Sequence, residues 1–198
     1  MMHALVAFTL LTLIPFEKDG KWGYRDNSGK VVIPPRYPVA QAFSPEGLAA
    51  VVDDDGWAYI DTAGRAVIRP LVVDNGPDYF REGVARFRRN GKVGFFDARG
   101  NVVIQPDYAY AMPFSEGRAA VCNGCTEVPE GEHRRVKGGK WGFIDRRGVL
   151  VIPLQFSDAG SFENGRARVR TGNVWLYIGR NGRAAPRGGT AGPRHPER

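Results

Sequence analysis

The residues best suited to chemistry lie close together, between residues 122 and 138. Cys122 and Cys125 stand at C-x2-C spacing, and His133 follows eight residues later. Two thiolates and an imidazole suit zinc, but a closed structural site needs a fourth ligand, and this segment has no second Cys or His pair. We therefore expect no metal and no other cofactor.

The two cysteines have three further interpretations. A disulfide between them would require an oxidising compartment. Thiol redox chemistry needs a helix N-terminus that stabilises the thiolate, and no helical pattern follows Cys125. The third interpretation, which we favour, is a pair of free thiols at the end of a strand and in a turn.

Arginines form the second group of candidate residues. They recur at alternate positions, on what should be the outward face of strands, where they would form a basic stripe if successive units align. Exposed aromatics between them would indicate single-stranded nucleic acid, but the neighbouring aromatics alternate to the opposite face, which favours a solvated surface. These arginines are Arg86, Arg88, Arg118, Arg166, Arg168 and Arg170. The candidate binding residues, from the 122–138 segment and from this stripe, are Arg118, Glu130, His133, Arg134, Arg135, Arg166 and Arg168.

No set of residues predicts catalysis. The three histidines, at positions 3, 133 and 195, are scattered along the chain. The sequence contains neither a G-x-S-x-G turn nor a phosphate-binding loop. We therefore expect a protein that is not an enzyme.

A repeated phrase defines the elements that must position these residues. It reads G-K-W-G-Y/F-x-D-x-x-G, and its copies end at steps of 35, 36, 48 and 34 residues. A period of this size indicates a repeat architecture in which each unit packs on its neighbours. The copies end at Gly29, Gly64, Gly100, Gly148 and Gly182; the tryptophans are Trp22, Trp57, Trp141 and Trp175, and the aspartates are Asp26, Asp61, Asp97 and Asp145.

Each unit contains three short segments, A, B and C in chain order, and each has the pattern of a strand. Segment A follows a glycine and has apolar residues two and four positions later, such as Ala119 and Val121 after Gly117. Period two is typical of a half-buried strand. Segment B is the Trp-Gly phrase, whose glycine leaves room for a neighbouring backbone or side chain. Segment C ends at a proline such as Pro153.

Turn chemistry joins the segments. The aspartate of the phrase and the glycine three positions later bound a four-residue turn, because Asp bonds backbone amides and Gly tolerates positive φ. B and C should therefore form an antiparallel hairpin, and A lies close enough to pair with B. The linker after each proline has room for a short helical turn. We predict an all-β fold, a tandem array of about five three-stranded antiparallel units, with an open twisted array or solenoid favoured over a closed five-bladed propeller.

The repeat sets the domain boundaries. An apolar segment at 1–11 precedes the array at 12–183, and a basic tail that we expect to be disordered follows at 184–198. The long step places an insertion at about 122–138, and insertions in repeat arrays usually form loops on one face, often the binding face. The units are 12–46, 47–82, 83–116, 117–164 and 165–183.

The N-terminal segment bears on location. Residues 4–14 have the length of a signal-peptide core and are too short to span a membrane as a helix. No Lys or Arg precedes them, and cleavage near residue 14 would destroy strand A of the first unit. These features favour the cytoplasm, whereas a start upstream of Met1 would allow secretion or an envelope location.

The repeated residues resemble the WG-repeat family, also called KWG repeats. Its pattern combines the Trp-Gly phrase with a following G-K-V-V-I-P-P-x-Y and a later F-x-E-G-L-A-x-V. The second unit departs from it at Ala58, the third at Val93, and the fifth at Leu176 and Gly179. The resemblance implies an all-β, mostly bacterial repeat module that mediates binding, and it implies no catalytic residue.

We expect a non-enzymatic binding or scaffold module. Its partner would be a protein or an envelope polymer, bound at the insertion and the adjoining arginines. The alternative is anion or nucleic-acid binding through the Arg-rich strand face and the basic tail, although we expect nucleic acid not to be the partner.

Overall fold

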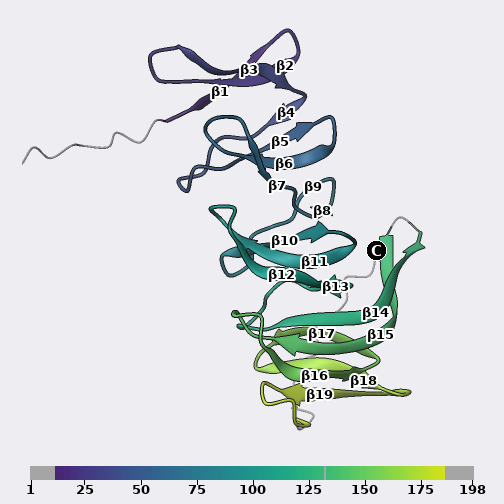
Figure 1. Ribbon diagram of the computed structural model, residues 1–198. Coiled ribbons are helices and arrows are strands. Elements are labelled where there is room, and N and C mark those ends of the chain that lie inside the picture. Colours follow the sequence, from purple (N-terminus) through teal and green to yellow (C-terminus); the bar gives the residue numbers. More distant parts are fainter. Residues whose placement is uncertain (1–11, 132, 186–198) are drawn as a thin grey trace, which may run out of the picture. The chain divides into compact units, whose positions relative to one another are not determined.

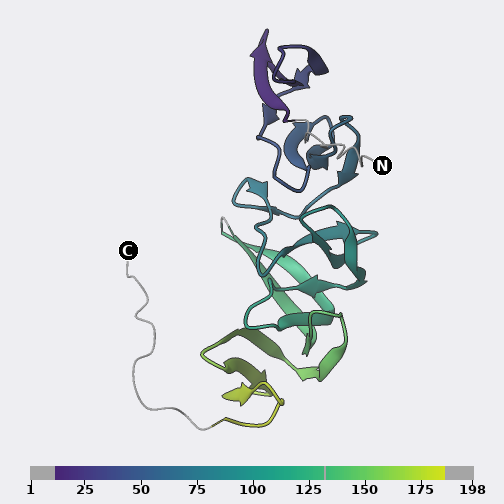
Figure 2. The ribbon, with the colours of Figure 1, turned by 90° about the vertical axis from the view of Figure 1, so that its left-hand side faces the viewer.

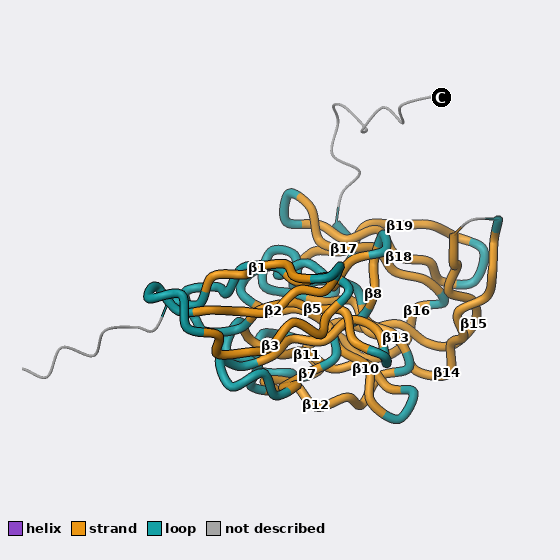
Figure 3. The backbone as a smooth tube through the Cα atoms, turned by 90° about the horizontal axis from the view of Figure 1, so that it is seen from above, coloured by secondary structure: helices purple, strands orange, loops and turns teal. Residues whose placement is uncertain are grey.

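The computed structural model describes residues 12–131 and 133–185, and every regular element in them is a β-strand (Figure 3). The strands form six antiparallel sheets, and none of these described sheets closes into a barrel. The all-β class and the tandem arrangement of antiparallel units are therefore confirmed. The segment at 1–11, and the tail beyond residue 185, lie outside the described residues.

The described chain divides into two compact units, one up to Tyr79 together with Phe96–Asn101, the other made of Phe80–Phe95 and the residues from Val102 onward. The first unit contains two sheets and a small hairpin (Figure 1). One sheet has the order β1 (Ile14–Lys18), β2 (Lys21–Arg25), β3 (Val31–Tyr37); the next has β4 (Val39–Ala40), β5 (Ala49–Asp53), β6 (Gly56–Ile60), β7 (Ala66–Ile68); and the hairpin joins β8 (Val72–Val73) to β9 (Gly76–Pro77).

The remaining strands form three sheets, and all of them except the end of β11 belong to the second compact unit. The order of the first sheet is β10 (Val84–Arg89), β11 (Lys92–Asp97), β12 (Val102–Tyr108). The second is β13 (Tyr110–Ala111), β14 (Ala119–Glu130), β15 (His133–Ile144), β16 (Leu150–Phe156), and the third is β17 (Asp158–Glu163), β18 (Arg166–Thr171), β19 (Val174–Gly179).

The aspartate turns form as the sequence predicts. In the first repeat, the Gly29 amide donates to the Asp26 carbonyl at 3.0 Å. The Asp26 carboxylate accepts from the Ser28 and Lys30 amides at 2.9 and 3.0 Å. Gly29 has a φ of 86°, which favours glycine. The same bonds recur at the other three turns, whose aspartates are Asp61, Asp97 and Asp145.

The glycine of the Trp-Gly pair allows segment C to cross segment B closely. A Cβ atom at Gly23 would lie 2.5 Å from the Ile33 carbonyl oxygen, and one at Gly142 would collide with the Ile152 carbonyl oxygen. β3 and β16 are seven residues long and continue past this crossing, to Tyr37 and Phe156. Ala58 replaces the glycine in the second repeat, and its β7 is only three residues long. The methyl group explains the shortening, because it occupies the space that the crossing backbone needs.

The linkers between repeats do not form helical turns, and that expectation was wrong. Most of their backbones pair instead with segment A of the following repeat, as Val39 does with Val52 and Tyr110 with Cys122, whereas the second linker forms the β8–β9 hairpin. This extra strand makes two of the sheets four-stranded rather than three-stranded. The linker also supplies a phenylalanine that packs edge-on against the preceding segment B, at ring separations of 4.8–5.0 Å; the pairs are Tyr24–Phe43, Phe95–Phe114 and Phe143–Phe162.

Successive sheets within each compact unit bury the aromatic face of one against the apolar face of the next. Tyr24 and Ile33 of the first sheet share a buried cluster with Val51 and Ile60 of the second. In the other unit, the β13–β16 and β17–β19 sheets lie against each other (Figures 1 and 2) and share a larger buried cluster. Its best-buried members are Ala120, Cys122, Phe143, Ile152, Phe162, Ala167, Val169 and Ile178.

Carboxylates tie neighbouring repeats of the second compact unit together. Glu116 accepts from the Gly165 amide at 2.8 Å and pairs with Arg180 at 3.2 Å. The bond from the Gly165 amide is the main reason why the pKa of Glu116 lies below its ordinary value. Glu82 makes the equivalent contacts one repeat earlier, to the Gly117 amide at 3.1 Å and to Arg146 at 3.3 Å.

Candidate functional site

The insertion of the fourth repeat forms a long hairpin rather than an irregular loop. β14 and β15 have 12 residues each and pair from Ala119–Ile144 to Glu130–His133. Their outer neighbours pair only near the base: β13 reaches Cys122, and β16 reaches Trp141. The pairs beyond these positions therefore form a two-stranded projection, visible in Figure 1, which we call the hairpin arm (residues 126–137).

The base of the arm holds both cysteines in buried positions. The structure joins Cys122 and Cys125 in a disulfide, with their Cα atoms 6.2 Å apart. Asn123 lies between them and accepts from the Ala109 amide at 3.0 Å. Gly139 lies opposite with a φ of 71°, and a Cβ there would lie 2.5 Å from the Asn123 carbonyl oxygen. The cysteines are thus part of the core between the last two sheets, not free thiols in a turn.

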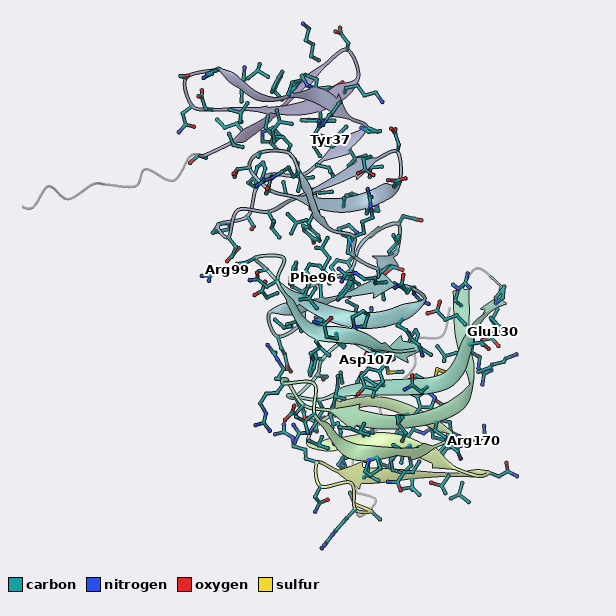
Figure 4. All side chains as sticks on the ribbon, in the orientation of Figure 1. Tyr37, Phe96, Arg99, Asp107, Glu130 and Arg170 are labelled. Atoms are coloured by element: carbon teal, nitrogen blue, oxygen red, sulfur yellow. A yellow bond between two sulfur atoms is a disulfide. The ribbon has the colours of Figure 1, made fainter. Side chains whose placement is uncertain are left out.

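The charged residues of the arm pair with one another. Glu127 accepts from Arg88 of β10 at 2.9 Å and lies 3.6 Å from Arg134. Glu130, labelled near the end of the arm in Figure 4, pairs with Arg135 at 3.2 Å. His133 begins β15, but its side chain lies outside what the structure describes. Arg88 therefore fixes the arm to a neighbouring sheet, a link that the repeat pattern does not contain because it joins residues 39 positions apart.

The predicted arginine stripe is not continuous. Arg86 is buried, with only 7% of its surface exposed, and it donates to the Ala111 carbonyl at 3.0 Å, so its predicted outward position is wrong. The first four residues of β10, from Val84 to Phe87, are all buried, and alternation therefore does not lead to solvent there. Arg118 is half-buried and donates to its neighbour Gly117 at 3.0 Å.

The arginines of β18 differ, because they lie on an outer face beside aromatic rings. The guanidinium carbon of Arg168 is 4.2 Å from the centre of the Trp175 ring, and that of Arg166 is 5.6 Å from the centre of Tyr177. Tyr177 is 42% exposed and shares this face with the arginines, so the expectation that the neighbouring aromatics lie on the opposite face is wrong in the fifth repeat. Trp141, at the equivalent position one repeat earlier, is buried.

The predicted site residues thus fall into two separate groups. Glu130, Arg134 and Arg135 lie on the arm, whereas Arg166 and Arg168 lie on β18. No recorded ion pair or hydrogen bond joins the two groups among the described residues. Sequence reasoning missed the exposure of Tyr177 and the partial exposure of Trp175; the signal was the loss of the repeat pattern after the fifth phrase, and no described sheet covers these two rings.

The described part of the chain offers few grouped side chains that could bind a metal ion. No group of three or more His, Cys, Asp or Glu residues there could hold a metal ion. The turn aspartates already bind groups of their own turns, as Asp145 shows. Burial raises the pKa of its carboxyl, but hydrogen bonds from the Val149 amide, the Arg147 side chain and the Arg147 amide together lower the pKa by more, so that it lies below its ordinary value.

Within residues 12–131 and 133–185, no helix is long and apolar enough to cross a membrane.

Comparison with known proteins agrees with this architecture. Four segments match the family model of the WG containing repeat, at residues 22–57, 57–92, 94–124 and 141–175, and together they make up more than half of the chain. A search of curated proteins found no match. Each matched segment starts within a B phrase or directly on its tryptophan, and thus follows the frame of the sheets described above. The chain belongs to the WG-repeat family.

Proposed function

We propose that this chain is a non-enzymatic binding module and that its hairpin arm contacts a protein partner. The support comes from one observation: β14 and β15 continue well past β13 and β16, so the arm has backbone edges that no neighbouring strand covers in the described residues. Exposed strand edges bind other chains through backbone hydrogen bonds.

The charges of the arm restrict which chain can bind. Glu130, Arg134 and Arg135 flank the open edges, and charged side chains on an edge oppose indiscriminate pairing. A partner must therefore match these charges as well as the backbone. The anchor between Arg88 and Glu127 holds the arm in one orientation, which lowers the entropy lost on binding.

Deleting the arm tests the proposal. Residues 126–137 would be replaced by Asn-Gly, a sequence that closes a two-residue hairpin, between Cys125 and Gly138, which are paired partners. Both proteins would be used for affinity capture from native extract, followed by mass spectrometry. We expect the full chain, and not the deletion, to retain a defined protein that then binds the purified full chain.

A matched control separates the arm from the rest of the surface. The double variant K92Q/K140Q changes exposed residues outside the arm and should keep the same partner. A deletion that folds, as judged by an unchanged β-sheet circular dichroism spectrum, and still binds every captured protein would contradict the proposal.

A further inference from the structure

We propose that the outer face of the β17–β19 sheet binds an extended acidic peptide that carries a carboxylate at every second residue. This face lies on β18 and β19, apart from the hairpin arm, and the proposal does not depend on the arm. No described strand covers it on the side away from the β13–β16 sheet (Figure 1).

The register of the two strands builds the face. Arg168 of β18 lies opposite Tyr177 of β19, and Arg170 lies opposite Trp175. Because side chains alternate along a strand, Arg166 shares the face with these four residues. The opposite face of the same strands contains Ala167, Val169 and Ile178, which are buried against the preceding sheet.

The positions of Arg168 and Arg170 are occupied by apolar residues one repeat earlier. Counted from the glycine that precedes segment A, Ala120 and Cys122 of β14 correspond to Arg168 and Arg170 of β18. Both are buried, because the last sheet packs on them. The final repeat therefore has arginines where the fourth repeat has core residues. The third repeat also has arginines there, but Arg86 donates to the Ala111 carbonyl and Arg88 pairs with Glu127. A polar surface would keep this end soluble, but mixed charges would do so without the mutual repulsion of adjacent arginines.

The arginines on this face are held in place without a carboxylate. Trp175 supports the guanidinium of Arg168 at 4.2 Å, an arrangement stabilised by cation–π attraction. Among the described residues, no ion pair involves Arg166, Arg168 or Arg170. Arg166, Arg168 and Arg170 form a row along β18. The strand register places Glu163 opposite Arg166 and Asp158 opposite Arg170, at the two ends of this row, whereas the bulge in β17 leaves Arg168 without a carboxylate opposite it.

The spacing of the row selects the form of the ligand. Residues two apart in a strand lie about 6.8 Å apart, and alternate residues of an extended peptide have the same spacing. Such a peptide lying along β18 would present one carboxylate to each guanidinium. Arg binds carboxylates through two parallel hydrogen bonds, and a guanidinium that already rests over a ring, as that of Arg168 does over Trp175, loses little freedom when it does so.

The same geometry disfavours nucleic acid. Single strands bind through bases that stack on free aromatic faces. Here the face of Trp175 is covered by Arg168, and that of Tyr177 by Arg166, so bases would have to displace the guanidinium groups. The edges of those groups remain available to anions.

Two labelled peptides of identical composition test the proposal. One alternates glutamate and threonine, and the other has all the glutamates in a block followed by the threonines. Fluorescence anisotropy at low salt, with a titration to about 0.15 M, where charges more than about 8 Å apart are screened, would compare them. We expect the alternating peptide to bind at least about tenfold more tightly, because only it places its carboxylates in register with the row.

Variants of the row complete the test. R168Q/R170Q should weaken binding of the alternating peptide about tenfold or more, and R168K/R170K, which keeps the charge but not the bidentate geometry, about threefold to fivefold. K92Q/K140Q removes the same charge elsewhere and should have little effect. The arm deletion should leave this binding unchanged, so that failure of this proposal and failure of the proposed function can be told apart.

Three outcomes would overturn the proposal. Equal binding of the two peptides would show unspecific attraction, and so would an equal loss in K92Q/K140Q. Tighter binding of oligothymidylate than of the alternating peptide, abolished by R168Q/R170Q, would make the face a nucleic-acid site instead. Unchanged thermal unfolding of the arginine variants would confirm that any lost binding comes from the face and not from misfolding.

Discussion

Single residues define the turns of this chain, and the aspartate at the start of each turn does so through its charge. Asp26 accepts from the Ser28 hydroxyl at 2.6 Å and from the Ser28 and Lys30 amides. The hydroxyl bond is the main reason why the pKa of Asp26 lies below its ordinary value of about 4. The carboxylate form is therefore the one that the folded chain prefers.

The charge of Asp26 makes stability depend on pH. Since the pKa is lower in the folded state, the contribution is fully present above pH ~4 and is lost as pH falls through the folded-state pKa. We expect D26N to lower the urea midpoint at pH 7 and to differ less from wild type below pH ~4. D54N is the control, because Asp54 is exposed and makes no recorded side-chain bond. A D26N difference that is constant with pH would contradict the expectation.

The glycine of the Trp-Gly pair is a second residue with a specific requirement. At Gly142 a methyl group would meet the backbone of Ile152 and Pro153. We expect G142A to lower the free energy of unfolding by about 1–3 kcal/mol, in the range of overpacked cores. G160A is the matched control, since the nearest atom to a Cβ there is 3.6 Å away. Equal midpoints for the two variants in urea denaturation would show that the crossing can relax.

Whole strands were predictable where their sequence has a period. Segment A alternates apolar and polar residues, segment B has its aromatics two positions apart, and segment C is an apolar run ended by proline, while the Asp-x-x-Gly turns fix how B and C are joined. The short strands β4 and β13 have two residues each, too few for a period. Arg86 was misplaced for a related reason: alternation gives two faces to a strand but does not say how many of them a neighbouring sheet covers.

The candidate site was predictable only in part, because the repeat frame locates irregular segments but not their contacts. The step of 48 residues placed the insertion, and the paired strands β14 and β15 lie there. The link from Arg88 to Glu127 depends on how two sheets stack, which one repeat unit does not encode. No described sheet covers Tyr177, so a position that is core in one repeat is surface in another.

The rigidity of the hairpin arm should depend more on the ion pair between Arg88 and Glu127 at its anchor than on the pair between Glu130 and Arg135 at its tip. E127Q removes the carboxylate shared by Arg88 and Arg134, whereas E130Q breaks only the pair with Arg135. Ion pairs at the surface contribute up to about 1 kcal/mol, so we expect amide hydrogen exchange in 126–137 to become up to about fivefold faster in E127Q. E130Q should change only the tip, and identical exchange in both variants would show that the anchor does not hold the arm.

The whole molecule is expected to be an open array. A compact protein of 198 residues has a radius of gyration of about 16 Å, and closure into a propeller would keep the value near it. We predict a clearly larger radius in small-angle X-ray scattering. The arm deletion is a useful control, because it removes a projection without changing the number of repeats; a radius near 16 Å for both proteins would favour closure.

The arginine face of β18 also governs how such a chain can lengthen in evolution. A duplicated repeat inserted between inner repeats would find the apolar surface that it needs, as Ala120 and Cys122 provide for the last sheet. A repeat added after β19 would meet Arg168 and Arg170 and would bury unpaired charge, which is strongly unfavourable. In this chain a repeat could therefore be added after β19 only if it supplied hydrogen-bond acceptors to these arginines, as the Ala111 carbonyl does for the buried Arg86.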